Sequence, residues 1–272
     1  TSVEVLSTTA GGGGDTVVLT LSPAVSVISV ADGANVTTTF SSFAGGTVIN
    51  NDAGNTLVVD TVAGASLAVS AAAINGQALT IADAVSVTVA GGIASGAFGS
   101  TALDDLDTTS LTVAAGSSAK DVSTGALTGT DSLASYTVSA VSTGGDATTG
   151  TLVDASSLTT LIVSGSAGDV TVGAIGGTNA AVNLSTVTTS AVGGSTTTVA
   201  AITADTVDSV VDNAMTLTAS ADIYSGAVFA VVTNTYGTID ANLSGAGAVD
   251  FTTGTGGMVG VDVTVDRSGD GA

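Results

Sequence analysis

The amino-acid sequence predicts an all-β protein, a parallel β-helix (β-solenoid) with coils of about 25 residues. Three observations lead to this fold. A seven-residue phrase that begins with Asp recurs at that interval. Short segments alternate apolar and polar residues, which is the pattern of strands with one buried face. Residues that favour helices are scarce, since the chain of 272 residues contains one Glu, one Lys, one Arg and one Gln.

The repeated phrase has Asp first, Gly four residues later and an aliphatic residue two positions beyond the Gly. Its clear copies occupy residues 121–127, 146–152 and 169–175. A drifting period with a constant phrase is typical of stacked coils, because insertions are confined to loops. We therefore expect Asp121, Asp146 and Asp169 to stack at equivalent corners of successive coils.

A second phrase keeps the same spacing at residues 111–113, 136–138 and 161–163. Each copy ends in Val, so Val113, Val138 and Val163 are expected to stack in the core. Only 3% of the residues are aromatic, so we expect a narrow core of Val, Ile, Leu and Ala. The competing architecture is a tandem array of β-sandwich domains, but such domains usually need about 100 residues each.

Weaker copies of the Asp phrase extend the array. They are residues 68–74, 92–98, 196–202, 222–228 and 250–256. The array is thus expected to span residues 65–256. Residues 1–64 fit the repeat least well and are interpreted as an irregular or capping β region. Residues 257–272 are interpreted as an acidic strand followed by a candidate Ca²⁺ loop.

The charge balance limits the partners of this chain. The net charge is −21, with 22 Asp and one Glu, and Asp is a turn residue that competes poorly inside helices and strands. The acids are therefore expected at corners. Two basic residues cannot neutralise a phosphate backbone, which argues against nucleic acid and anionic membrane surfaces. No apolar run reaches the length of a membrane span.

The aspartates also suggest Ca²⁺ sites. Residues 266–271 match the first six positions of a calcium loop, in which Asp266, Ser268 and Asp270 supply alternate oxygen ligands and a Gly permits the sharp turn. The loop is incomplete at Ala272, and we expect the natural polypeptide to continue. The alternative is a free acidic tail.

Two further groups of aspartates are candidate Ca²⁺ ligands. Asp104, Asp105 and Asp107 crowd one expected corner, where carboxylates repel one another unless a cation or solvent screens them. A solvated loop is the alternative there. Asp121, Asp146 and Asp169 form the other group, in which hydrogen bonds to turn amides are the alternative to a shared cation.

Catalytic chemistry is poorly supported. The chain contains no His and no Cys, and its one Lys and one Arg are far apart in the sequence. The usual triads and acid–base pairs therefore cannot be assembled, and we expect no enzymatic activity. Without Cys, rigidity must come from repetition and bound cations instead of disulfides. The chain begins at Thr1 without a readable leader, which suggests a processed product.

In residues 157–165 and 169–173, and in its Thr/Ala/Gly/Val/Asp-rich style, the chain resembles bacterial surface-layer and repeats-in-toxin-type cell-surface proteins. The resemblance implies a secreted β-solenoid that binds Ca²⁺ at turns and assembles with itself into a lattice or filament on the cell. A cell-surface polysaccharide is then a candidate anchor. The chain departs from that family by lacking tandem perfect nonapeptides.

Three functional hypotheses follow. The leading one is a self-assembling extracellular structural subunit, and the second is an adhesin stalk that presents a binding domain. The third is surface binding by a flat Thr-rich face, as in ice-binding proteins. That third hypothesis requires Thr rows in register on successive coils. The Thr clusters at residues 37–39 and 196–198 show no such register in the sequence, so this hypothesis is disfavoured.

Overall fold

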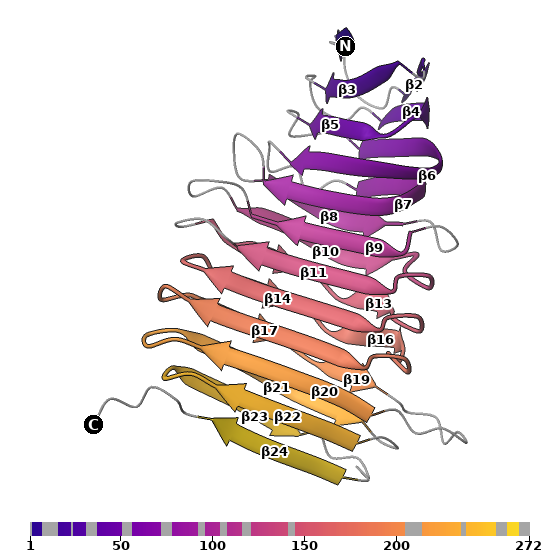
Figure 1. Ribbon diagram of the computed structural model, residues 1–272. Coiled ribbons are helices and arrows are strands. Elements are labelled where there is room, and N and C mark those ends of the chain that lie inside the picture. The colour runs from indigo at the N-terminus through magenta and orange to yellow at the C-terminus, as the bar shows by residue number, and fades with distance from the viewer. Residues whose placement is uncertain are drawn as a thin grey trace.

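The computed structural model describes residues 2–6, 16–22, 24–30, 37–50, 56–71, 78–91, 96–103, 108–115, 121–140, 145–204, 214–234, 238–253 and 260–266. Throughout these residues the regular structure is strand, and no helix occurs among them. Accordingly, no described segment is a helix long and apolar enough to cross a bilayer. The strands pair in parallel and stack as successive coils (Figure 1). The predicted β-solenoid is confirmed.

The longest strands are β6 and β7, with 16 and 14 residues, whereas the strands from β9 to β19 have three to seven residues. Their bounds are β1 Ser2–Leu6, β2 Thr16–Thr20, β3 Val25–Val30, β4 Thr37–Phe43, β5 Gly46–Asn50, β6 Thr56–Ala71, β7 Ala78–Gly91, β8 Gly96–Ala102, β9 Ser110–Ala114, β10 Val122–Thr128, β11 Ser135–Ala140, β12 Ala147–Thr149, β13 Leu152–Asp154, β14 Thr160–Ser166, β15 Val170–Val172, β16 Ile175–Asn179, β17 Thr186–Val192, β18 Thr196–Val199, β19 Ile202–Ala204, β20 Ala214–Ala221, β21 Gly226–Asn234, β22 Thr238–Ser244, β23 Ala248–Thr253 and β24 Gly260–Asp266.

Two long stacks of parallel strands run the length of the molecule. Face A consists of β1, β3, β5, the second part of β6 and of β7, β9, β11, β14, β17, β20, β22 and β24. Face B consists of β2, β4, the first part of β6 and of β7, β8, β10, β12, β15, β18, β21 and β23. This stack bends at β8 and β10, because the ends of these strands are in register with β7 and β13 whereas their beginnings are in register with β12. At about 4.8 Å per strand, face A rises roughly 50 Å.

The first strands belong to the same two stacks as the rest of the chain. β1, β3 and β5 continue face A, and β2 and β4 continue face B. β6 runs across the boundary expected near residue 64 and contributes to both faces. At the other end, β24 pairs with β22 in unbroken register. The described part of the chain therefore forms one continuous array.

A single coil in the centre shows how the corners are made. β12 lies on face B, and β13 lies on a third side, where Leu152 pairs with Leu127 at the end of β10 and the stack continues in β16 and β19. A tight turn then closes with a bond from the Leu158 amide to the Ala155 carbonyl, 3.0 Å. β14 returns along face A. The same turn recurs at Leu133 and Leu184, and all three leucines are fully buried.

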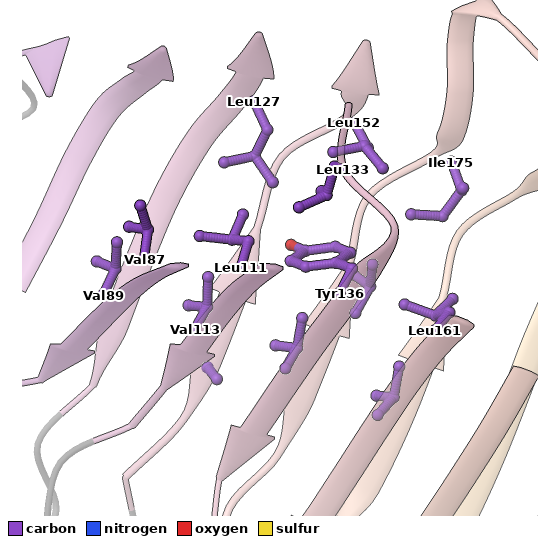
Figure 2. Close-up of a cluster of buried hydrophobic side chains, with 14 of the residues drawn as sticks. Val87, Val89, Leu111, Val113, Leu127, Leu133, Tyr136, Leu152, Leu161 and Ile175 are labelled. Carbon is purple, nitrogen blue, oxygen red and sulfur yellow. The ribbon is translucent and has the colours of Figure 1, made fainter. Parts of the chain in front are cut away.

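The core is a column of aliphatic side chains between the faces. Val113, Val138 and Val163 occupy equivalent positions of β9, β11 and β14, and each is fully buried, as the spacing predicts. Figure 2 shows the adjoining column, in which Leu111, Tyr136 and Leu161 follow one another along the stack. Across the core from them lie Leu127, Leu152 and Ile175 of β10, β13 and β16. Burial is therefore shared between neighbouring coils, as expected for a solenoid.

The core is less purely aliphatic than its composition suggests. Phe40, Phe43 and Tyr136 are fully buried, as are several hydroxyl-bearing side chains. Tyr136 is the largest of the fully buried side chains. Burial raises the pKa of Tyr136 far above its ordinary value, and the nearby Thr149 hydroxyl offsets this only in part. The phenol therefore stays protonated at any physiological pH.

The glycine of the repeated phrase forms the corner between face B and the third side. A Cβ built on Gly150 would lie 2.5 Å from the Gly125 carbonyl oxygen, and one built on Gly173 would lie 2.4 Å from the Gly150 carbonyl carbon. Both contacts are with backbone, which cannot move aside cheaply. Gly recurs here because successive corners stack backbone on backbone with no room for a side chain.

Replacing Gly150 by Ala is therefore expected to destabilise the fold by about 1–3 kcal/mol, the usual cost of overpacking. Gly226→Ala is the matched control, since its Cβ would meet the Thr196 Cγ2 at 3.8 Å and the Ala248 carbonyl oxygen at 3.9 Å, which are ordinary contacts. Thermal and urea unfolding of both variants measure the difference. Equal stability of the two variants would contradict the stacked-glycine corner.

Candidate functional site

The predicted aspartate ladder exists, and the carboxylates bond the backbone of the next coil. The Asp146 amide donates to Asp121 Oδ1 at 2.9 Å. The Asp169 amide donates in the same way to Asp146 Oδ1 at 2.9 Å. The Thr196 amide then donates to Asp169 Oδ1 at 2.7 Å. All three aspartates lie exposed at one corner, so each joins its coil to the following one.

The position of Thr196 shows where the ladder ends. Thr197 pairs with Val170, so Thr196 occupies the position of Asp169 one coil later. Thr196 in turn pairs with Gly226, and Gly226 pairs with Ala248. The expected copies that begin at Asp222 and Asp250 are therefore wrong, because these aspartates lie four residues before and two residues after the equivalent positions. Loops of unequal length displace them.

The upstream copies are displaced as well. Phe98 pairs with Thr124 instead of Leu127, so the copy at residues 92–98 is out of register by three residues. Residues 68–71 lie on face A, where they pair with β5 and β7, and not at the aspartate corner. Among the described residues the phrase therefore stays in register from residue 121 to residue 202, since Thr196 occupies the position of Asp169 and Ile202 pairs with Ile175.

Asp222 lies at a different corner, where its carboxylate accepts hydrogen bonds from a side chain and from the backbone of the preceding coil. Its Oδ2 accepts a bond of 2.8 Å from the Gly193 amide of the preceding coil, and its Oδ1 accepts a bond from the Ser225 hydroxyl. The Ser225 hydroxyl oxygen also accepts the Gly194 amide at 3.0 Å. The bonds from Ser225 and Gly193 hold the pKa of Asp222 below its usual value. This corner is thus another clasp between coils.

The calcium candidates fall into two groups. Asp121, Asp146 and Asp169 are described, and each has a backbone amide as a partner. Asp266 ends β24 opposite Ser244. The other candidates lie outside the described residues; they are Asp104, Asp105, Asp107, Ser268 and Asp270. Within the described ranges, no three His, Cys, Asp or Glu side chains gather as they would around a metal ion. Calcium binding therefore stays a prediction.

An unexpected pair of acids lies where β6 and β7 turn between the two faces. Asp60 pairs in register with Ala82, next to Asp83. Partial burial, the negative charge of Asp83 and the contact between the two carboxyl groups raise the pKa of Asp60. Asp83 also has a left-handed backbone, with φ of 63°. No repeat phrase marks this pair, so the sequence alone could not reveal it.

Face A carries an ordered field of hydroxyl groups that sequence reasoning missed. Its central outward column runs through Thr88, Thr112, Thr137, Ile162, Thr188 and Thr218. The columns on either side consist of Ser86, Ser110, Ser135, Thr160, Thr186 and Thr216, and of Ala90, Ala114, Ser139, Ser164, Ser190 and Ser220. We call these outward positions of β7, β9, β11, β14, β17 and β20 the hydroxyl face.

The expectation that Thr residues lack register is therefore wrong for this surface. The Thr clusters used to judge it, residues 37–39 and 196–198, lie in β4 and β18 of face B. The rows of face A escape notice because the loops between coils differ in length. The interval is 25 residues from Thr112 to Thr137, but 30 residues from Thr188 to Thr218.

Variants at the aspartate corner test whether the carboxylates are stabilised by hydrogen bonds to backbone amides or by a bound metal ion. Asp146→Ala removes the acceptor of the Asp169 amide and is expected to cost about 1–2 kcal/mol. Asp146→Asn keeps an acceptor oxygen and removes one negative charge, so it should melt at the parent temperature or above it. Chelator should leave the parent's melting temperature unchanged. A loss of many degrees on chelation, reduced in the Asp121→Asn/Asp146→Asn variant, would instead show cation-bridged corners.

The Asp60–Asp83 pair predicts a pH effect of defined sign. Because the folded-state pKa of Asp60 lies above its ordinary value of 3.8, folding favours its protonated form. Its contribution to stability is therefore lost as pH rises through the folded pKa and regained as pH falls towards 3.8. Asp60→Asn should raise the melting temperature at pH 7, whereas Asp250→Asn, an exposed acid of β23, is the control. A lower melting temperature for Asp60→Asn would refute this interpretation.

Comparisons with known proteins do not indicate a function for this chain. No protein-family model matches the chain, and neither a curated protein nor a solved structure matches it. The resemblance to surface-layer and repeats-in-toxin-type proteins accordingly stays a hypothesis drawn from sequence style. The described residues form a stack of coils with hydrogen-bonded corners and one face lined by hydroxyl-bearing side chains.

Proposed function

We propose that the chain is a structural subunit of a secreted, self-assembling bacterial cell-surface layer or extracellular filament. The observation that carries the proposal is the continuity of the array. Both faces run through the described residues as unbroken stacks of parallel strands, and successive coils are also joined by side-chain clasps at their corners. Such a body resists deformation along its axis and repeats the same strand arrangement from coil to coil.

The energetics also suit an architectural role. In a solenoid each coil is stabilised by its neighbours, so a long rod is built without a large globular core. The clasps at Asp121, Asp146 and Asp169 add backbone bonds from coil to coil. This cohesion requires neither disulfides nor a reducing or oxidising environment, which suits a chain that contains no Cys.

The negative net charge of the chain is compatible with an extracellular surface, and it means that assembly must overcome repulsion between subunits. At −21 per chain, like subunits repel over about 8 Å at physiological ionic strength. Ordered assembly therefore needs divalent cations, pairing of strand edges or contact through an uncharged surface. Ca²⁺ bound through Asp104, Asp105, Asp107, Ser268 or Asp270 is one proposed source of cohesion, and a cell-surface polysaccharide is the proposed anchor.

A rod is equally suited to hold a binding domain away from a cell, so an adhesin stalk is the competing function. The two functions predict different behaviour of the isolated protein. A layer or filament subunit associates with itself, whereas a stalk stays monomeric at any concentration.

Electron microscopy and analytical ultracentrifugation of the purified protein, each with millimolar Ca²⁺ and with chelator, test the proposal. We expect ordered sheets or fibres and association that increases with protein concentration. If chelation dissolves the assemblies, cations supply the cohesion; if the assemblies persist, protein–protein contacts do. A monodisperse monomer at high concentration in Ca²⁺ would reject the structural-subunit function and favour the stalk.

A further inference from the structure

We propose that the hydroxyl face of face A is the surface through which two copies of this chain pair, antiparallel and related by a two-fold axis near Ile162. The inference rests on the proposed self-assembly and specifies its contact surface. It is carried by the distribution of charge on face A, the strand spacing and area of that face, and the central location of the exposed apolar side chain of Ile162.

Charge singles out this surface. The chain carries a net charge of −21, yet the outward positions of face A from Ser66 to Ser220 contain no charged residue. The described aspartates of the central coils lie at the corners instead, as Asp121, Asp146 and Asp169 do. Two copies that approach through the hydroxyl face therefore bring the fewest like charges together, and interface cores are depleted of charge in general.

An acid beyond the hydroxyl face determines the orientation. Asp240 of β22 continues the column of Thr186 and Thr216 at the C-terminal end of face A. A parallel pair would place this carboxylate opposite its own copy. An antiparallel two-fold arrangement places the two copies of Asp240 at opposite ends of the pair, each against the uncharged outward positions of β7. A self-complementary two-fold interface is also the commonest way for identical chains to associate.

Periodicity favours a second copy over an unrelated partner. The outward side chains form ridges along each strand, and strands repeat about every 4.8 Å. A partner meshes with every groove only if it has the same repeat, and another copy of this chain has it by construction. From β7 to β20 the hydroxyl face measures about 29 by 22 Å at ordinary strand spacing and rise. That is roughly 630 Å² per copy, or about 1,300 Å² in total, which lies within the range of specific, stable interfaces.

Ile162 supplies an anchor near the middle of the surface. It is 37% exposed and interrupts the Thr column between Thr137 and Thr188. Val192, which is 39% exposed, lies at the end of β17 on the edge of the same face. The other described exposed hydrophobic residues lie at turns or on face B, as Tyr224 and Val18 do. An apolar side chain at the centre of an interface, surrounded by small polar neighbours that exclude water, is the arrangement typical of a binding hot spot.

Matched charge variants test the surface. Thr137→Asp/Thr188→Asp places carboxylates on both sides of Ile162, whereas Thr148→Asp/Thr171→Asp adds the same charge to exposed positions of face B. Sedimentation of each variant in Ca²⁺ gives its association constant, and circular dichroism confirms that each is folded. We expect association to fall at least about a hundredfold in the first variant and less than about threefold in the second.

Cysteine cross-linking tests the orientation, because the parent chain contains no Cys. In the antiparallel pair Thr112 of one copy lies opposite Thr218 of the other, since β9 and β20 are equally far from β14. A mixture of Thr112→Cys and Thr218→Cys proteins should form mixed cross-linked dimers with a short bifunctional reagent. Each protein alone should form few.

The possible results separate this inference from the proposed function. Assembly that survives in Thr137→Asp/Thr188→Asp, or cross-linking of Thr112→Cys to itself, overturns the inference but leaves the structural-subunit function standing. A parent protein that stays monomeric in Ca²⁺ overturns both. A monomer that adsorbs to ice or to a crystalline polysaccharide through this face also overturns the inference, because the ordered hydroxyl rows would then serve a solid surface.

Discussion

The parallel register between successive coils is the constraint on which the rest of this structure depends. A residue on one coil is bonded to its equivalent on the next, so every position of the repeat becomes a column along the rod. A column of Leu or Val extends the core. A column of Asp or Gly lies at a corner between strands, where the residue must fit the turn of the backbone. Stability is then a sum of contacts between neighbours, and any residue that does not fit its column strains two interfaces.

The corner residues follow from this constraint. Carboxylates stacked about one strand spacing apart repel by roughly 1 kcal/mol per pair even in water. The ladder of Asp121, Asp146 and Asp169 tolerates this because each carboxylate accepts an amide from the following coil. A charged acceptor makes a stronger bond than a neutral one. At the next corner Gly150 and Gly173 recur because backbone contacts leave no space for a Cβ. Asp thus recurs at its corner because its carboxylate accepts a hydrogen bond from the next coil. Gly recurs at its corner because it has no side chain.

The sequence predicts the architecture and the central corners well. In the phrases that begin at Asp121, Asp146 and Asp169, the same number of residues separates the strand of face B from the strand of the third side. The sequence spacing alone therefore aligns these phrases. Asp222 and Asp250 were misassigned because longer or shorter loops shift the phrase without shifting the strands. The same loops hide the Thr rows of face A, where hydroxyl positions align only once the backbone register is known. The Asp60–Asp83 contact lies across two strands and has no sequence signature. Sequence spacing therefore predicts which residues stack where the loops between coils have equal lengths. Where the loop lengths differ, the strand register of the structure is needed to identify the stacked residues.

The central claim is that exposed carboxylates clasp successive coils through backbone amides. Hydrogen exchange of the Asp146, Asp169 and Thr196 amides, measured by NMR with chelator present, tests it most directly. These amides belong to exposed or half-buried corner residues, which would exchange rapidly if they faced only water. The account predicts protection comparable to that of the neighbouring strand amides, with Asp146→Ala selectively accelerating exchange at Asp169. Rapid exchange of all three amides in the parent protein would contradict it.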